Sequence, residues 1–402
     1  MCGIAGFCNF KEDFEENTDY WNFRLEKMRA VLAHRGNDAR GRFLKKHIGL
    51  SHSRLAIRDI LCGDQPMTRT HNGYEYTICY NGEIYNTDEL IPELSENGFV
   101  CSTTSDTEVI LYAYIHWGAD FVNRLNGIFA FAIWDAAKSR LLLYRDRVGV
   151  KPLFYAIRGD SLVFGSEPKA CFAHPAVKPE LDKQGLQELL AIGPAHTSGL
   201  SLFKDLFEVL PGHFMIYSQD GLHDETYWEL TSREHTESYR DTVAHTRFLV
   251  EDAIKRQMVS DVPVCTFLSG GIDSSIVTAI AANYMNTRGK TLNTFSFDFK
   301  DNDRYFKANA FQPERDLPYV NRMLEEYETA HSYLECDENS LFKALFAAVD
   351  AKDMPGMTDV DSSLLYFCSL VSRKNKVALT GECADEIFGG YPWFYRKELL
   401  ER

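Results

Sequence analysis

The pattern of hydrophobic and polar positions changes near residue 238 and divides the chain into two parts. Before that point, short apolar runs typical of β-strands recur, and only a few stretches show the 3.6-residue period of a helix. This mixture predicts an α+β domain with largely antiparallel sheets. The strand-like runs cover residues 74–86, 127–135, 139–147, 161–167 and 213–218, and the helical stretches cover 24–34 and 107–117.

After residue 238, helical stretches alternate with short buried strands, which favours a doubly wound α/β fold around a parallel sheet. Because only three strands precede the end of the sequence, we expect this domain to be incomplete and the polypeptide to continue beyond Arg402. The predicted helices cover 239–258, 274–285, 318–327, 340–350 and 363–374, and the predicted strands cover 264–268, 293–299 and 377–380.

A polar, acidic segment joins the two parts. Residues 227–238 contain few apolar side chains and show no helical or strand period, so they read as a linker. We therefore predict a first domain at 2–225, a linker at 226–239 and a second domain at 240–402.

Composition narrows the classes of protein that the chain can represent. Its 43 basic and 58 acidic residues give a formal charge of −15, which repels nucleic-acid phosphates, so we expect no nucleic-acid partner. No apolar run approaches the roughly 20 residues that span a bilayer, and the amino terminus lacks a secretory signal pattern, so we expect a cytoplasmic protein without a membrane partner. The ten cysteines include no Cys-x-x-Cys pair, which argues against a structural zinc site and fits a reducing compartment.

The segment SGGIDSS, residues 269–275, lies between a predicted strand and a predicted helix. Backbone N–H groups and hydroxyls at such a turn converge at the positive end of the helix dipole and can hold phosphate. Asp273 within the turn suggests a Mg²⁺ ion between its carboxylate and the phosphates. The alternative is an ordinary strand-to-helix turn. The candidate phosphate-binding residues are Ser269, Gly270, Gly271, Ser274 and Ser275.

SGGIDSS resembles the signature of the ATP pyrophosphatases, the PP-loop family, which cleave ATP between its α- and β-phosphates. A second element, VALTGECADEIFGG, combines a strand, a turn and an acidic cluster. In a parallel sheet its Glu382 and Asp385 would emerge at the same edge as Asp273. The alternative for these two carboxylates is capping of a helix N-terminus.

Cys2 follows the initiator methionine, and its small side chain permits removal of Met1. Removal leaves a thiol and an α-amine on one residue, and such a residue can act as a nucleophile with its own amine as base. The alternative for Cys2 alone is a small buried residue on an N-terminal strand. The interpretation of Cys2 depends on a set of motifs in the same domain. They are MCGIAGF at 1–7, HRGND at 34–38, SRLAIRD at 53–59, NGEIYN at 81–86, TSDTEV at 104–109 and RDRVGVKPLFY at 145–155.

Together these segments resemble a class II glutamine amidotransferase domain, whose fold is an αββα sandwich of the N-terminal-nucleophile hydrolase type. The resemblance implies Cys2 as nucleophile and Arg54 as partner of the glutamine α-carboxylate. It also implies that Glu83 and Asp106 receive the α-ammonium, and that Asn81 and Gly82 form the oxyanion hole. One departure is Asn37, where the family has proline, and we expect it to alter only a turn. HRGND and RDRVGVKPLFY are equally explained as scaffolding loops around the pocket.

A glutaminase domain followed by an SGGIDSS domain is similar to glutamine-dependent asparagine synthetase over essentially the whole chain. The resemblance implies that glutamine supplies ammonia to an acceptor carboxylate, activated by ATP as an acyl-adenylate with Mg²⁺. It implies a homodimer as well. By the same resemblance, Leu268 and Phe297 line the adenine site, residues 269–275 with Thr380 and Gly381 hold the phosphates, Asp273 and Asp385 bind Mg²⁺, and Glu382 faces the reacting centre.

The acceptor is open at this stage. Asparagine synthetases often carry an Arg-Ala-Ser run before the last strand, whereas this chain has Asp359 and Asp361, which would repel an aspartate carboxylate or else cap a helix beginning near Ser362. Aspartate is the first expectation, and another carboxylate with the same mechanism is the alternative. A third reading is a non-catalytic relative that binds glutamine or nucleotide.

Overall fold

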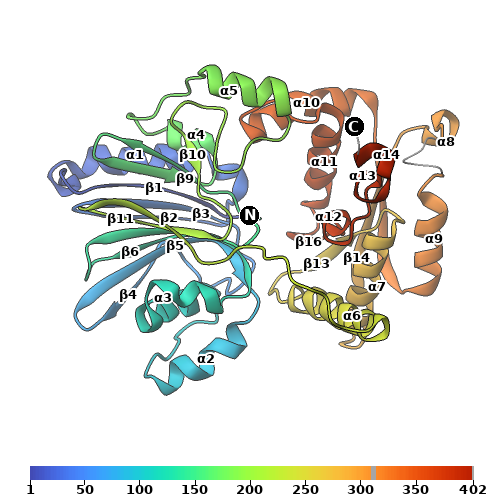
Figure 1. Ribbon diagram of the computed structural model, residues 1–402, viewed down its shortest axis with the longest axis horizontal. Helices are drawn as coiled ribbons and strands as arrows, with labels where there is room; N and C mark the ends of the chain where they lie inside the picture. The colour runs from blue at the N-terminus through green and yellow to red at the C-terminus, as the bar shows by residue number, and fades with distance from the viewer. Residues whose placement is uncertain (309–313, 401–402) are drawn as a thin grey trace. The chain divides into compact units, whose positions relative to one another are not determined.

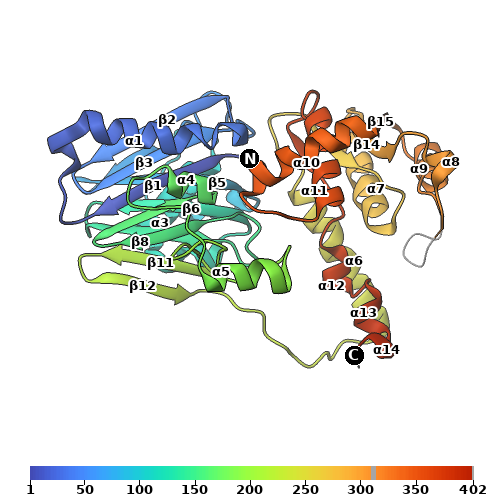
Figure 2. The same ribbon diagram turned by 90° about the horizontal axis from the view of Figure 1, so that it is seen from above.

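The computed structural model describes residues 1–308 and 314–400 and divides into two units. The first unit comprises Met1–Glu234 with Val349–Gly356, and the second comprises His235–Ala348 with Met357–Arg402. Residues 227–237 contain no helix or strand, and this segment leads from β12 (Gly221–Thr226) to α6 (Tyr239–Arg256), as Figure 2 shows.

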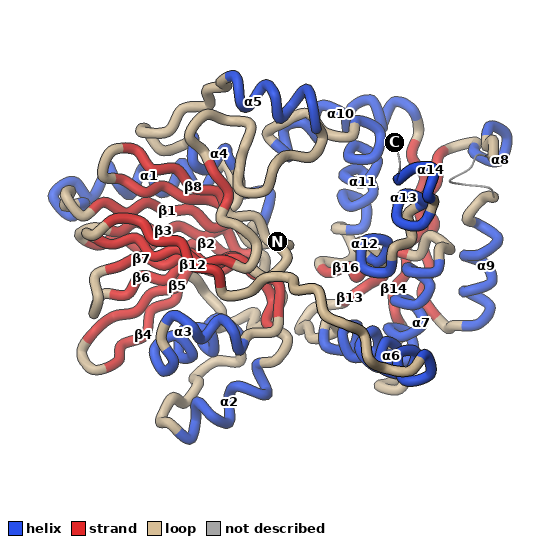
Figure 3. The backbone as a smooth tube through the Cα atoms, viewed as in Figure 1, coloured by secondary structure: helices blue, strands red, loops and turns tan. Residues whose placement is uncertain are grey.

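The first unit contains two six-stranded antiparallel sheets, drawn in red in Figure 3. One sheet has the order β10-β8-β9-β1-β3-β2 and the other β12-β11-β7-β6-β5-β4. The remaining strands are β1 (Gly3–Asn9), β2 (Ala39–Lys45), β3 (Ile48–Arg54), β4 (Met67–His71), β5 (Tyr74–Ile84), β6 (Gly127–Asp135), β7 (Arg140–Arg145), β8 (Phe154–Arg158), β9 (Ser161–Gly165), β10 (Phe207–Glu208) and β11 (His213–Ser218).

Helices cover the outer faces of both sheets (Figure 1). Helix α1 (Thr18–Ala30) packs on β1 and β3, and α4 (Pro168–Phe172) packs on β9, whereas α3 (Asp106–Trp117) packs on β4 and β5. This arrangement confirms the predicted αββα sandwich. The other helices of the unit are α2 (Thr87–Glu96), α5 (Lys183–Gln187), a π-helix (Glu188–Ile192) and the 3-10 helices Phe14–Asn17, Ala33–Arg35 and Ala119–Arg124.

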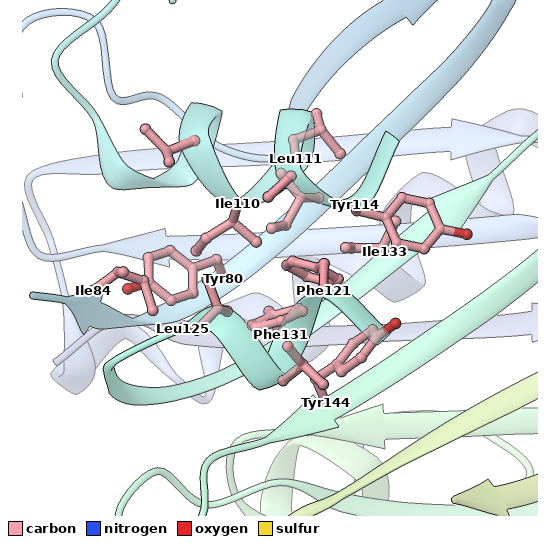
Figure 4. Close-up of a cluster of buried hydrophobic side chains, with 14 of the residues drawn as sticks. Tyr80, Ile84, Ile110, Leu111, Tyr114, Phe121, Leu125, Phe131, Ile133 and Tyr144 are labelled. Carbon is pink, nitrogen blue, oxygen red and sulfur yellow. The ribbon is translucent and has the colours of Figure 1, made fainter. Parts of the chain in front are cut away.

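The apolar runs of the sequence fill three layers of core. Strand β6 carries GIFAFAIWD and is buried along most of its length because one face meets the opposite sheet and the other meets α3. Figure 4 shows the layer beneath α3, where Tyr80 and Phe131 of the sheet meet Ile110 and Tyr114 of the helix. Burial on both faces explains why these strands read as continuous apolar runs rather than as alternating ones.

The second unit is built on a four-stranded parallel sheet with the order β15-β14-β13-β16. Apolar side chains pack on one face against α7 (Ile272–Asn286) and on the other against α11 (Thr358–Val371), which confirms the predicted doubly wound fold. The strands are β13 (Val264–Phe267), β14 (Leu292–Phe299), β15 (Thr329–Cys336) and β16 (Val377–Leu379). The other helices are α8 (Asn302–Tyr305), α9 (Leu317–Glu326), α10 (Glu338–Lys352), α12 (Ala384–Phe388), α13 (Pro392–Tyr395) and α14 (Lys397–Leu400).

Two sequence predictions for this unit are wrong. The sheet has a fourth strand, β15, which lies at an edge and is only half-buried, so its sequence TAHSYLEC lacks the apolar run of its neighbours. Helix α11 begins at Thr358 rather than near Ser362, so Asp359 and Asp361 lie inside its first turn, where acidic side chains favour the helix dipole.

Within the described residues, no helix is both long and apolar enough to cross a membrane.

Candidate functional site

Cys2 immediately precedes β1, which pairs with β3 and so places the thiol beside the segment that follows β3. The main-chain N–H of Leu55 donates to Cys2 Sγ at 3.3 Å, and the thiol lies 3.6 Å from the Leu55 carbonyl oxygen. Burial raises the pKa of the Cys2 thiol, and the hydrogen bond from Leu55 partly opposes that effect. The thiol therefore needs a nearby base to become a nucleophile at neutral pH.

A cavity beside Cys2 collects most of the residues predicted to bind glutamine. Its wall is formed by β3, β5, the start of α3 and the loop after β3. The predicted residues in the wall are Cys2, Arg54, Gly82, Glu83 and Asp106, and the additional residues are Leu55, Ile57, Arg58, Gly63, Gln65, Tyr80, Ser105 and Thr107. Asn81 is 1% exposed and does not line this cavity, but its Nδ2 has no hydrogen-bond partner among the residues that the structure describes.

Arg54 is already engaged by the protein. Its guanidinium donates to the carbonyl oxygens of Arg58, Asp59 and Ile60, and to Asp64 Oδ1 at 3.1 Å. These bonds hold the loop that forms one wall of the cavity. Among the described partners of Arg54, Asp64 is the one that contacts it through a side chain, which is 76% exposed, so a ligand carboxylate can replace it and leave the loop in place.

Asp106 lies at the first residue of α3, and Oδ2 makes all of its described contacts. It accepts hydrogen bonds from the Tyr80 hydroxyl at 2.8 Å and the Ile84 N–H at 3.0 Å, and Arg58 Nη1 lies 3.9 Å away. Among the described residues, Oδ1 takes no hydrogen bond, which leaves it to accept from a cationic ligand group.

Strand β5 presents Asn81 and Gly82 in register with Ala130 and Phe129 of β6. A Cβ atom at Gly82 would lie 2.3 Å from the carbonyl oxygen of Ile128, so glycine is required for the two strands to pair here. Sequence reasoning missed two side chains that hold this strand. Gln65 Oε1 accepts from the Tyr80 N–H at 2.6 Å, and His52 Nε2 lies 3.0 Å from the Tyr80 carbonyl oxygen.

The RDRVGVKPLFY segment acts as a scaffold within the first unit. The Asp146 carboxylate accepts main-chain N–H groups from Phe129, Val148, Val150 and Lys151, and so fixes the loop after β7. In HRGND, Asp38 Oδ2 accepts from the Ala56 N–H at 2.8 Å, and Asn37 is exposed. Neither of these two segments contributes to the described wall of the Cys2 cavity, but Gly36 packs against the main chain of Arg54 and Leu55, and Arg35 Nε donates to the Cys2 carbonyl oxygen at 2.9 Å.

In the second unit, the SGGIDSS segment forms the predicted turn between β13 and α7. Gly270 has φ of +84°, which L-residues with side chains rarely adopt, and a Cβ there would lie 2.8 Å from the Asp316 carbonyl oxygen. The Ser269 and Ser274 hydroxyls bond to each other at 2.9 Å. Within the part of the chain that the structure describes, no side chain caps the N-terminus of α7, so its first-turn N–H groups are available to an anion.

The TGECADE segment meets this turn at the same edge of the sheet. Strands β13 and β16 run parallel, and a Cβ at Gly381 would lie 2.7 Å from the main-chain nitrogen of Ser274. Burial raises the pKa of Asp273, and the neighbouring Asp385 carboxylate raises it further. Two neighbouring carboxylates are oxygen donors of the kind that Mg²⁺ prefers. The described residues contain no group of three or more His, Cys, Asp or Glu side chains that could hold a metal ion, so phosphate and water oxygens would have to complete such a site.

Some of the residues predicted to bind ATP line one of two cavities. One, of about 410 Å³, includes Leu268, Ser269 and Phe297 and lies at the carboxyl ends of β13, β14 and β15. The other, of about 790 Å³, includes Asp273, Thr380, Gly381 and Glu382 and continues along the apolar sides of α6 and α7. The other predicted residues line neither of these two cavities: Gly270 and Gly271 lie in the turn before α7, Ser274 and Ser275 at the start of α7, and Asp385 in α12.

Comparison with known proteins supports both domains. A family model described as glutamine amidotransferase domain matches residues 1–228, and one described as asparagine synthase matches residues 245–402. The Bacillus subtilis protein named asparagine synthetase (glutamine-hydrolyzing) 3 is 48% identical over 400 residues, covering 99% of this chain and 64% of that protein.

Two further relatives show the range of names. A Methanocaldococcus jannaschii protein, also named for glutamine-hydrolyzing asparagine synthesis, is 32% identical over 97% of this chain and 76% of its own length. A Penicillium rubens protein named amidase chyE is 31% identical over 100% of this chain and 60% of its own length. The chain thus spans less than two thirds of the length of the Bacillus and Penicillium proteins.

Proposed function

Because the chain belongs to the glutamine-hydrolysing asparagine synthetase family, we propose that it takes nitrogen from glutamine and joins it to a carboxylate activated by ATP. The proposed reaction converts L-aspartate, L-glutamine, ATP and water into L-asparagine, L-glutamate, AMP and pyrophosphate. The observation that carries the proposal is the cavity that brings Cys2 together with Arg54, Gly82, Glu83 and Asp106.

Glutamine hydrolysis begins at Cys2. After removal of Met1, the α-amine of Cys2 takes the thiol proton while Sγ attacks the side-chain amide carbon of glutamine. The proton passes to the leaving nitrogen, ammonia departs, and water hydrolyses the thioester to glutamate. The unpartnered Asn81 Nδ2 and the Gly82 N–H would stabilise the oxyanion, and loss of one such donor typically raises the barrier by about 3 kcal/mol.

The same cavity has charges that can orient glutamine. Asp106 Oδ1 and Glu83 provide negative charge for the α-ammonium group. Arg54 can exchange Asp64 for the α-carboxylate, since guanidinium and carboxylate groups match in geometry. This assignment makes Arg54 and Asp106 binding residues and leaves the chemistry to Cys2, Asn81 and Gly82.

The second unit would form the acyl-adenylate. Adenine would lie against Leu268 and Phe297, and the phosphates would lie on the 269–275 turn with Thr380 and Gly381. A carboxylate oxygen of the acceptor attacks the α-phosphorus and pyrophosphate leaves; ammonia then attacks the acyl carbon and AMP leaves. Mg²⁺ held by Asp273 and Asp385 would neutralise charge on the pyrophosphate, and Glu382 would face the reacting centre.

The acceptor is proposed as aspartate because the similar bacterial protein is named for that product. A different carboxylate is the second candidate, favoured by the acidic first turn of α11 and by the amidase name of the fungal relative. We propose a cytoplasmic location, as the sequence pattern favours, and a homodimer, as the family resemblance implies.

Product analysis separates these acceptors. Incubating the protein with glutamine, MgATP and aspartate should yield asparagine and pyrophosphate in a 1:1 ratio, and omitting aspartate should reduce pyrophosphate release at least tenfold. Pyrophosphate release without asparagine, restored by another carboxylic acid, would transfer the proposal to that acid. Absence of both glutamate and pyrophosphate formation would favour the non-catalytic alternative.

A further inference from the structure

Lys151 is a buried cation that the mechanism above does not use. It lies in the loop between β7 and β8, and the residue is 7% exposed. Among the described residues, its Nζ makes one hydrogen bond, to Met1 Sδ at 2.9 Å. A thioether is a weak acceptor, so this contact does little to offset the burial of an ammonium group.

The position of Lys151 does not depend on Met1. Its main-chain N–H donates to Asp146 Oδ2 at 2.9 Å, and its carbonyl oxygen accepts from Arg145 Nε at 3.0 Å. Arg145 is itself paired with Glu208 at 2.7 Å. The main chain that carries the ammonium is therefore held on both sides whether or not residue 1 is present.

Several charged groups from different elements lie around the Lys151 ammonium and the amino end of the chain. Arg35, from the 3-10 helix before β2, donates from Nε to the Cys2 carbonyl oxygen at 2.9 Å. Glu83 of β5 and Arg54 of β3 act on Cys2 across the cavity, and Asp146 acts on Lys151 from the loop after β7. Arg35 is paired with Glu167 at 2.6 Å, and Glu83 and Asp146 keep their negative charges. Lys151 is thus a cation near the amino end whose Nζ contacts no carboxylate among the described residues.

We propose that, once Met1 is removed, the Lys151 ammonium faces the new α-amine of Cys2 and keeps that amine unprotonated at neutral pH, ready to accept the thiol proton. This inference rests on the proposed glutaminase function. Lys151 acts through the amine of Cys2, so it is a positioning residue for the base and does not touch the substrate.

The charge balance gives the direction of the effect. Burial and the charge of Arg35 lower the pKa of Lys151, with opposing effects from Glu83, Asp146 and Cys2. The ordinary pKa of an α-amine is about 2.5 units below that of a lysine, so the amine still loses its proton first when the two lie close together. In the chain that retains Met1, burial lowers the pKa of the terminal amine to about 6, with further lowering by Arg35 and Lys151 and opposing effects from Cys2 and Glu83. Removal of the lysine charge should therefore raise the pKa of the Cys2 amine.

The test compares Lys151→Met with Lys151→Arg in the full chain, after mass spectrometry confirms that Met1 is absent. Lys151→Met should move the acidic limb of kcat/KM for glutamine hydrolysis upward by about one pH unit, which reduces activity about twofold at pH 7 and several-fold at pH 6, and leaves it nearly unchanged at about pH 9. Lys151→Arg should leave the acidic limb of the kcat/KM profile near its original pH, because arginine keeps the positive charge. KM for glutamine should change less than twofold in both, because Lys151 does not line the cavity. Lys138→Met, at the exposed turn between β6 and β7, is the matched control and should change nothing.

A second measurement does not depend on catalysis. The pH dependence of acetylation of the Cys2 α-amine by acetic anhydride reports its pKa directly, and Lys151→Met should raise that value by about one unit. If Lys151→Met fails to fold, Lys151→Gln replaces it, with the same expected shift. An unchanged amine pKa in the neutral variants would overturn the inference. An original protein that shows the expected amine pKa but no glutamine hydrolysis would instead overturn the proposed function.

Discussion

At the scale of single residues, the first unit places buried charges where they hold the main chain of the nucleophile. Arg35 donates to the Cys2 carbonyl oxygen and pairs with Glu167 at 2.6 Å, and His34 and Lys169 also contact the Glu167 carboxylate. Burial alone would raise the pKa of Glu167, but the hydrogen bond from His34 and the charge of Arg35 lower it to about 2. The carboxylate is thus part of the support for Cys2.

This shift predicts an acid-dependent contribution to stability. A carboxyl whose pKa falls on folding stabilises the protein above its unfolded pKa, about 4.5, and loses that contribution as the pH falls toward 2. Glu167→Gln should lower the free energy of unfolding by about 3 kcal/mol at pH 7, with the difference shrinking below about pH 4.5. Urea unfolding of both proteins between about pH 3.5 and 7 measures this difference in the free energy of unfolding.

The control for this measurement is Glu75→Gln, whose carboxylate is about half exposed and 3.9 Å from Lys45, so it should change stability by less than about 0.5 kcal/mol. A difference between Glu167→Gln and the original protein that stays constant across this pH range would show that ionisation of Glu167 is not what stabilises the unit.

The sequence identified Cys2, Arg54, Gly82, Glu83 and Asp106 because they stand in recognisable motifs, and the structure brings them to one cavity. It did not identify His52 or Gln65 as neighbours of the site, and it placed Lys151 only within a segment around the pocket, without a role of its own. Lys151 meets Met1 across 149 intervening residues, and His52 reaches Tyr80 from the opposite sheet. Such contacts arise from the stacking of sheets, which no local pattern encodes.

At the scale of elements, the pairing of β5 with β6 determines where the candidate oxyanion donors lie. Asn81 and Gly82 face Ala130 and Phe129, and any atom added at Gly82 would meet the main chain of Ile128 and Phe129. A side chain can move aside more readily than a paired strand. The glycine is therefore a requirement of the sheet as well as of the site.

Gly82→Ala should lower the free energy of unfolding by about 3 kcal/mol, because β5 and β6 must separate to admit the methyl group. Gly73→Ala is the matched control in the turn between β4 and β5, where φ is +81° and no atom lies within 4 Å of the added Cβ, and should cost about 1 kcal/mol of backbone strain. Equal urea midpoints for the two variants would contradict this explanation of Gly82.

Strands could be predicted from the sequence where most of their side chains are buried. Strands β6 and β13 are mostly apolar, and β14 has phenylalanine at positions 295, 297 and 299; the predicted positions of all three agree with the structure. Strand β15 was not predicted because its sequence has no apolar run. It lies at the edge of the sheet, where it pairs through its main chain while its side chains remain half-exposed and mostly polar.

At the scale of the whole molecule, two units with different sheet types carry different halves of one proposed reaction. The antiparallel sandwich holds the Cys2 cavity, and the parallel sheet gathers the SGGIDSS and TGECADE turns at one edge. The change of hydrophobic pattern near residue 238 predicted this division, because helix-strand alternation and antiparallel strands leave different signatures. The acceptor could not be predicted in the same way, because it depends on a few side chains such as Asp359 and Asp361 rather than on the fold.

The central claim is that the nitrogen released at Cys2 becomes the amide of the product. The direct measurement supplies glutamine labelled with ¹⁵N in its side-chain amide, MgATP, aspartate and unlabelled ammonium, and follows the product amide by mass spectrometry. The original protein should transfer ¹⁵N from glutamine to asparagine. Cys2→Ala should give asparagine whose amide comes only from the unlabelled ammonium. Transfer of ¹⁵N from glutamine by Cys2→Ala would contradict the account.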